Sequence, residues 1–96
     1  MRTIDILKNE YPGDSAWQNF YDVFKDGWNS VKNQAEYLRE IPDEKIATVL
    51  AVKMGERGLS WFFSPSNALD GNTPSQIMST GQQGEMAIKT LIMRLP

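Results

Sequence analysis

Aromatic side chains recur at helical spacing in the first third of the chain. Intervals of three and four residues place them on one face of a helix: Trp17, Phe20, Tyr21, Phe24 and Trp28. Ser15 and Gln18 stand in the spacing of a capping box, which predicts that the helix starts there. Gly27 is expected to bend or break this helix before it resumes toward Glu40. We expect the aromatic stripe to be core, with a partner groove as the alternative.

A second helix is predicted to end near Met54. Its apolar residues repeat on a helical period: Ile46, Val49, Leu50 and Met54. Pro42 is tolerated in a first helical turn, and Asp43 favours the positive end of the helix dipole. Gly55 and Gly58 mark the end of this helix.

Turn and capping signals fill the C-terminal third. Asp70-Gly71 predicts a turn. Thr73 begins a capping box with proline at the first helical position, and Thr80 begins a second box. A last helix follows with an apolar stripe on one face: Ile88, Leu91, Ile92 and Leu95. No stretch alternates apolar and polar residues, so no strand is predicted.

These patterns predict an all-α fold, a small single-domain helical bundle of about four to six helices, some of them short. Residues 1–13 show no helical pattern and end in the turn signal Pro12-Gly13, so we expect an irregular N-terminal arm. Residues 14–96 then form the single helical domain. A chain of 96 residues is long enough for one modest core.

The composition removes several kinds of chemistry. The chain has no Cys and no His, which excludes disulfides, Cys-based metal sites and Ser–His or Cys–His catalysis. Carboxylates four residues apart, such as Asp22 and Asp26, are interpreted as a solvated helix face rather than an acid–base pair. Gly81 to Gly84 lacks the strand and the Lys-Ser/Thr of a P-loop. We therefore expect no enzymatic activity, no metal and no cofactor.

Charge and hydropathy argue against nucleic-acid and membrane partners. The net charge is −2, from ten basic and twelve acidic residues, so no basic face is available globally. A helix-turn-helix in 45–63 fits poorly, because Ala51 and Val52 stand where its turn belongs. No apolar run has the length of a membrane span or a signal peptide. We expect a cytoplasmic protein.

An ordered set of residues runs through the C-terminal third. It consists of Trp61, Pro65, Ala68, Leu69, Gly71, Thr73 and Pro74, followed by Ile77-Met78, Thr80, Gly84, Ile88, Leu91-Ile92 and Arg94-Leu95. In this order and spacing, 58–96 resembles the Xre/MbcA/ParS toxin-binding domain of bacterial type II antitoxins. Phe62 and Ser66 stand for a Leu and an Asn of the family pattern. The same residues also suit caps, a tight turn and a core, so the set identifies a scaffold better than contact residues.

The resemblance implies a protein that binds and neutralises a cognate toxin by covering its active site. In much of the family that toxin consumes NAD, as RES-type or ADP-ribosyltransferase-like proteins do, and the antitoxin often dimerises. The expected contact residues lie on the exposed side of the last helix and at its end: Lys89, Arg94, Leu95 and Pro96.

Three departures from the family pattern matter. Family antitoxins commonly continue through a Gly-containing tail that reaches the toxin's active site, whereas the sequence given stops at Pro96, so we do not expect the usual mode of occlusion. Residues 1–40 do not look like the usual DNA-binding module, and Gly58 replaces a common Ala. A stand-alone adaptor on the same scaffold, such as one encoded by a mobile element, is the alternative function. A DNA-binding regulator is the weaker alternative.

Overall fold

The computed structural model describes the backbone of residues 3–95 and the side chains of residues 5–95. The described residues form helices and contain no strand, which confirms the all-α prediction. The α-helices are α1 (Thr3–Asn9), α2 (Asp14–Phe24), α3 (Gln34–Glu40), α4 (Glu44–Met54), α5 (Arg57–Phe62), α6 (Pro74–Met78) and α7 (Gln82–Arg94). Two 3-10 helices, η1 (Lys25–Ser30) and η2 (Asn67–Leu69), complete the described elements.

The chain divides into two compact units, where the sequence predicted one helical domain over 14–96. Unit 1 combines Met1–Gly13 with Trp61–Pro96, and unit 2 is Asp14–Ser60. The division falls inside α5. The chain therefore leaves unit 1 after α1 and returns to it only within α5.

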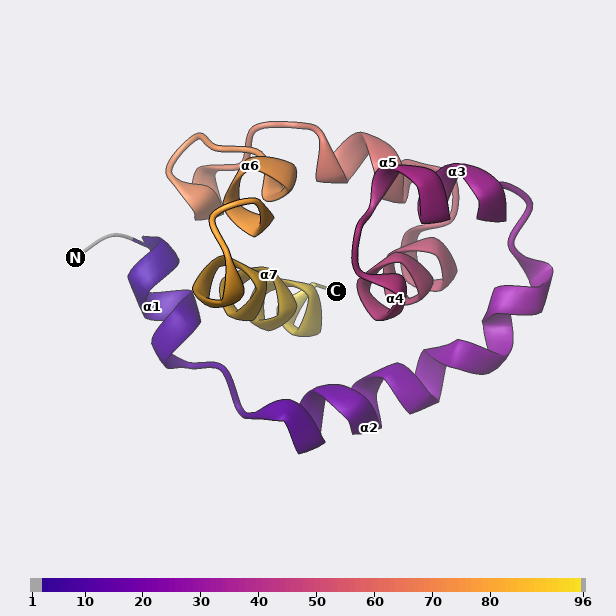
Figure 1. Cartoon of the computed structure of the whole chain (residues 1–96), viewed down its shortest axis with the longest axis horizontal. Helices are drawn as coiled ribbons and strands as arrows, with labels where there is room; N and C mark the ends of the chain where they lie inside the picture. Colours follow the sequence, from indigo (N-terminus) through magenta and orange to yellow (C-terminus); the bar gives the residue numbers. More distant parts are fainter. Residues whose placement is uncertain (1–2, 96) are drawn as a thin grey trace. The chain divides into compact units, whose positions relative to one another are not determined.

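Unit 1 is built around α7. Both α1 and α6 lie against this helix (Figure 1). The largely buried apolar residues of unit 1 come from every one of its elements: Leu7, Phe62, Leu69, Pro74, Ile77, Met78, Ala87, Ile88 and Ile92. Ile88 and Ile92 confirm the predicted buried stripe of the last helix, whereas Leu91 and Leu95 are only half-buried.

The predicted irregular arm is wrong for Thr3–Asn9, which form α1. A helix of seven residues is too short to be stable by itself, because the cost of nucleation is spread over few hydrogen bonds. Its stability comes from packing on α7, in which Leu7 is 4% exposed. Short sequence windows carry little periodicity, so this tertiary contact gave no clear signal.

Unit 2 holds α2, η1, α3, α4 and the first residues of α5. The helix predicted to bend at Gly27 ends at Phe24 and continues as η1. A Cβ on Gly27 would lie 2.6 Å from Cγ1 of Val52, so glycine is required for η1 to approach α4. The N-cap of α4 is Asp43, whose carboxylate accepts a 2.9 Å hydrogen bond from Ile46 N; Pro42 therefore precedes the helix instead of entering its first turn.

The three predicted capping boxes have different outcomes. The box at Ser15 is wrong, because α2 already begins at Asp14 and Ser15 lies inside the helix. At α6, Thr73 Oγ1 accepts from Gln76 N at 3.0 Å and Gln76 Oε1 accepts from Thr73 N at 2.8 Å, which confirms the first box. The box predicted at Thr80 is wrong, because α7 begins after Gly81, which has a φ of 116°. The Thr80 hydroxyl instead donates to the Ile77 carbonyl at 2.7 Å and closes the end of α6.

The predicted turn at Asp70-Gly71 is confirmed. Both residues have positive φ, 56° for Asp70 and 85° for Gly71. Gly71 N donates to Ser66 O at 2.9 Å, and Ser66 N donates to Asn72 O at 3.0 Å. These bonds close the segment around η2 into a compact loop.

None of the helices in residues 3–95 combines the length and the apolar character that crossing a membrane requires.

Candidate partner-binding surface

The last turns of α7 carry the contact residues expected from the sequence. Arg94 is exposed, whereas Lys89 and Leu95 are half-buried. Pro96 lies outside the described residues. The structure thus brings three of the four candidates together along one end of α7 in unit 1.

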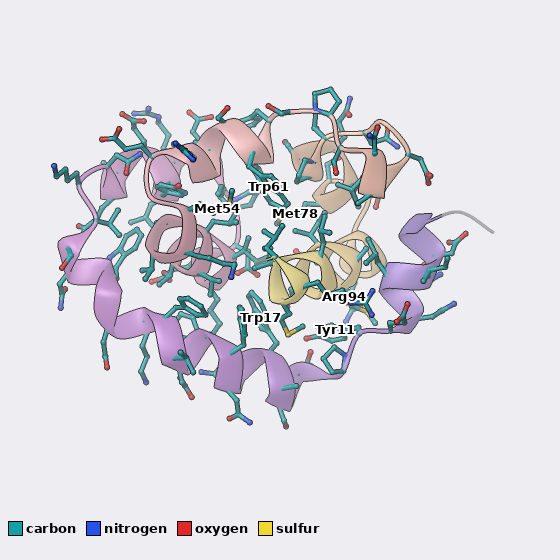
Figure 2. The ribbon with its side chains drawn as sticks, turned by 180° about the vertical axis from the view of Figure 1, so that it is seen from behind. Tyr11, Trp17, Met54, Trp61, Met78 and Arg94 are labelled. Carbon is teal, nitrogen blue, oxygen red and sulfur yellow. The ribbon has the colours of Figure 1, made fainter. Side chains whose placement is uncertain are left out.

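Both cations of this surface already have partners from the N-terminal segment. Lys89 Nζ lies 5.9 Å from the centroid of the Tyr11 ring, a cation–π distance. Arg94 forms an ion pair with Glu10. Figure 2 labels Tyr11 and Arg94, one residue from each of these two contacts. Sequence analysis did not identify Glu10 and Tyr11, because their role depends on a tertiary contact between the two ends of the chain.

A third polar contact joins α1 to the first turn of α7. Lys8 Nζ donates to Gln83 Oε1 at 3.3 Å, at an exposed position. The polar contacts of the N-terminal segment therefore extend from the first turn of α7 to its last. We call the α7 residues in these contacts, Gln83, Lys89 and Arg94, the α7 face.

The residues that carry the family resemblance build the scaffold of unit 1 and do not gather in a site. Leu69, Pro74, Gly84 and Ile88 are buried, Gly71 and Thr73 shape a turn and a cap, and Trp61 and Leu91 are half-buried. Pro65 and Thr80 are exposed. A structural role accounts for most of the set, as expected from the residue types.

Gly84 shows how tightly α6 and α7 meet. A Cβ at this position would overlap the Ile77 carbonyl oxygen and the Thr80 hydroxyl. The Ile77 carbonyl oxygen belongs to the backbone, so it cannot move away by a change of rotamer. Glycine is therefore needed where α7 passes the end of α6.

The aromatic stripe of unit 2 is core at one end only. Trp17 is 3% exposed, whereas Phe20, Tyr21, Phe24 and Trp28 are half-buried. The ring centroids of Phe20 and Phe24 lie 4.9 Å apart. Two α4 lysines extend over the stripe, Lys45 at 5.6 Å from the Tyr21 centroid and Lys53 at 5.7 Å from the Phe24 centroid.

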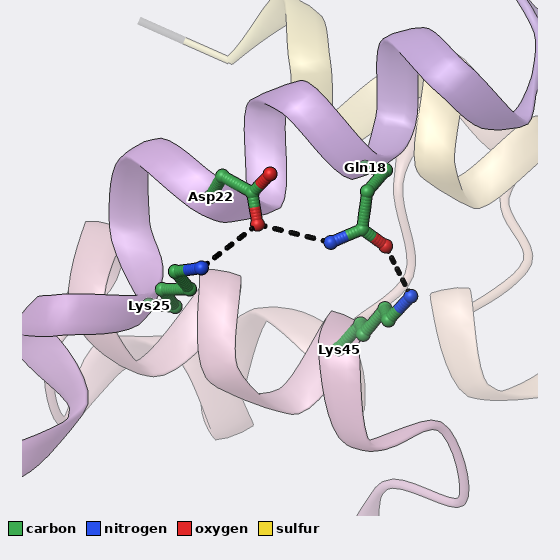
Figure 3. Close-up of polar contacts among 4 residues, drawn as sticks. All are labelled: Gln18, Asp22, Lys25 and Lys45. Carbon is green, nitrogen blue, oxygen red and sulfur yellow. Dashed lines mark hydrogen bonds and ion pairs between the residues drawn. The ribbon is translucent and has the colours of Figure 1, made fainter.

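A polar network runs along the exposed edge of α2 (Figure 3). Gln18 accepts a hydrogen bond from Lys45 and donates one of 3.0 Å to Asp22, which also pairs with Lys25 at 3.2 Å. The hydrogen bond from Gln18, and then the one from Lys25, lower the pKa of Asp22 below its ordinary value. A surface carboxylate held in its charged form fits the interpretation of a solvated helix face and not of a general acid.

A pocket of about 460 Å³ opens between η1 and the end of α4. Its walls come from two stretches of unit 2: Gly27, Ser30, Val31, Lys32, Asn33, Ala51, Val52, Gly55 and Glu56. Sequence analysis missed this pocket, because its walls are brought together only by the close approach at Gly27.

The stretch tested as a helix-turn-helix does contain two helices, α4 and α5, which flank a turn at Gly55 and Glu56. Ala51 and Val52 stay inside α4, as the poor match to the motif implied. Among the described residues, no group of three or more Asp and Glu could hold a metal ion.

Comparison with known proteins identifies no relative. No family model matches the chain, and neither a curated protein nor a solved structure matches it significantly. The sequence pattern of 58–96 and the geometry of unit 1 are therefore the grounds for proposing a function.

Proposed function

We propose that the chain is an antitoxin-like protein of the cytoplasm that binds a cognate toxin and covers its active site. The resemblance of 58–96 suggests an NAD-consuming toxin, of the RES type or similar to ADP-ribosyltransferases. The observation that carries the proposal is the placement of the resembling segment. Residues 61–96 belong to one compact unit around α7, whose last turns present Lys89 and Arg94.

The roles of the other resembling residues support this proposal. Thr73 caps α6, Gly71 adopts a positive φ and Gly84 permits the close contact of α6 and α7. Each role favours that residue type at that position, so the ordered set supports one arrangement of short helices. A scaffold specified in this way would hold the α7 face in a fixed geometry for a partner.

The chemistry of the α7 face suits a protein partner. Arg94 offers a planar guanidinium that can form paired hydrogen bonds to a carboxylate, and arginine is frequent among residues that dominate binding energy. Leu95, half-buried beside it, adds apolar area. A dimer of the antitoxin, as the resemblance implies, would present two such faces.

Affinity purification of the tagged chain from its native host, followed by mass spectrometry, tests the proposal. The expected result is a stoichiometric partner whose expression alone arrests growth and whose co-expression with the chain restores it. Arg94→Glu should lose most of the partner, while the matched reversal Arg39→Glu on the exposed side of α3 should retain it. A growth-neutral partner, or equal capture by both variants, contradicts the proposal.

A stand-alone adaptor remains the second candidate, and one observation favours it. Val23 is 75% exposed and Leu38 is 50% exposed, and both lie in unit 2, outside the resembling segment. Exposed apolar side chains on helices are common elements of protein interfaces. Under this function, Val23→Asp and Leu38→Asp would each lose the co-purified partner, whereas Arg94→Glu would keep it.

A DNA-binding regulator is a weaker third candidate. A gel shift at low salt with DNA from its own promoter tests it, since phosphate contacts are strongest there. Absence of a shift removes this candidate.

A further inference from the structure

We propose that the N-terminal segment, α1 followed by Glu10 and Tyr11, covers the α7 face and stands in for the partner, so that the partner that displaces it presents a carboxylate and an aromatic ring directly after a short helix. This inference rests on the proposed function, because it concerns the same surface. It adds the chemistry of the partner's contact segment and a covered state of the free protein.

The contacts of the N-terminal segment supply the first argument. Glu10 and Tyr11 are adjacent in sequence, and they engage Arg94 and Lys89, the two cations that we expect at the partner surface. Leu7 supplies a buried apolar anchor beside them. Carboxylate, ring and aliphatic side chain together satisfy the α7 face as a bound peptide would.

The exposure of the polar contacts that this segment makes with α7 supplies the second argument. Leu7 is the one buried side chain among the described residues of α1, and Ile6 is 39% exposed. The contacts of Lys8 with Gln83 and of Glu10 with Arg94 are both exposed, where solvent screens charged groups. A seven-residue helix has little stability of its own once these contacts are broken.

The linker after α1 supplies the third argument. Pro12 and Gly13 connect α1 to α2, and Gly13 has a φ of 105° with open space around it. Such a link permits α1 to swing away without rearranging the helix that follows. The link thus supplies a hinge about which the segment can leave α7.

The partner's chemistry follows from what it must replace. To bind the α7 face, it must offer an anionic group to Arg94 and a π-face to Lys89 in adjacent positions, with an aliphatic residue about one helical turn before them. A short helix with an apolar residue in its last turn, followed directly by an acidic and then an aromatic residue, meets all three requirements. A basic or purely polar segment does not.

Hydrogen exchange of the full-length protein, measured by NMR, tests the covered state. The α1 amides should exchange at least about tenfold faster than the α7 amides, because α1 opens while α7 stays folded. Glu10→Gln combined with Tyr11→Ala should speed α1 exchange further and leave α7 exchange unchanged. Equal exchange rates in α1 and α7 of the wild type would show that the two open only together and would overturn the inference.

A labelled peptide with the sequence of residues 3–13 tests the chemistry of the partner. It should bind the full-length Leu7→Asp variant, whose own α1 is released, and bind the wild type at least about tenfold more weakly, because the site is occupied there. Peptides carrying Glu10→Lys or Tyr11→Ala, and the protein variant Leu7→Asp with Arg94→Glu, should bind weakly. Lys25→Glu in place of Arg94→Glu is the control and should not weaken binding.

Three results would overturn the inference. One is equal peptide binding to the wild type and to Leu7→Asp. Another is loss of α7 exchange protection in Leu7→Asp, which would make α1 a structural part of unit 1. The third is a dimer in light scattering that exchanges α1 between copies. None of these results concerns toxin capture, so failure here and failure of the proposed function are distinguishable.

Discussion

The hydroxyl of Tyr37 fills the space that any side chain at Gly58 would need. Tyr37 is 0% exposed, and its hydroxyl donates to the Gly55 carbonyl, so it is held in place from α3 to the turn after α4. A Cβ at Gly58 would overlap this hydroxyl. The Ala common at this position in the family pattern therefore does not fit here.

Gly58→Ala is expected to destabilise the protein by about 1–3 kcal/mol, because a methyl group is forced into a filled space. Urea denaturation followed by circular dichroism measures the decrease in the free energy of unfolding. The variant Tyr37→Phe removes the conflicting oxygen, so the double variant should be less unstable than the sum of the single effects. Strict additivity of the two changes would show that the residues do not share this space.

Gly84→Ala is expected to destabilise unit 1 by about 3 kcal/mol or more, because the new methyl group meets the Ile77 carbonyl and backbone cannot yield. Gln82→Ala, an exposed change in the first turn of the same helix, should stay within about 0.5 kcal/mol. Thermal unfolding measures the unfolding midpoints of Gly84→Ala and Gln82→Ala for comparison. Similar midpoints for the two would contradict the tight crossing of α6 and α7.

Thr73→Ala is expected to cost about 1 kcal/mol, the usual loss on removing a capping threonine. Thr80→Ala should cost less than Thr73→Ala, because Gly81, not Thr80, caps α7 and the change removes only the hydrogen bond from the Thr80 hydroxyl to the Ile77 carbonyl. The two threonines look equivalent in sequence, so their unfolding free energies separate a true cap from an apparent one. A larger decrease in the unfolding free energy for Thr80→Ala than for Thr73→Ala would contradict the assignment of Thr73 as the cap.

Gln18→Ala is expected to raise the pKa of Asp22 toward its ordinary value, because the Gln18 amide is the largest cause of the lowered pKa. Lys25→Met should raise the same pKa less. Carboxyl-carbon NMR titration of Asp22 measures both shifts. An unchanged Asp22 pKa in Gln18→Ala would mean that Lys25 alone sets it.

The pH dependence of stability follows from the same carboxylate. A pKa lowered in the folded state means that the contribution of Asp22 is present at neutral pH and is lost as the pH falls through that lowered pKa, below the ordinary aspartate range near about 3.9. Asp22→Asn should flatten this part of the thermal-midpoint profile. The change should be small, because the group is solvent-exposed.

Local signals in the sequence predicted much of the fold. Thr73 with Gln76 and Gly55 at the end of α4 act through neighbours within one turn, and the structure has them as expected. The stripe of Ile88 and Ile92 marked the buried side of α7. These features depend on spacing alone, which a single sequence contains.

Features that depend on distant residues were not predicted. Helix α1 was missed because seven residues show no clear period and its stability lies in the contact of Leu7 with unit 1. Glu10 and Tyr11 were missed as partners of Arg94 and Lys89 for the same reason. The pocket of unit 2 depends on how closely Gly27 approaches Val52, which no local pattern encodes.

The pairing of α1 with α7 also orders events during folding. Lys8 and Gln83 are 75 residues apart in the chain, and Glu10 and Arg94 are 84 apart. Closing so long a loop is entropically costly, and contacts of this separation slow folding compared with those inside a helical hairpin. Helices α6 and α7 are neighbours in sequence and can associate first, so the α1–α7 contact belongs to the last step by which unit 1 is completed.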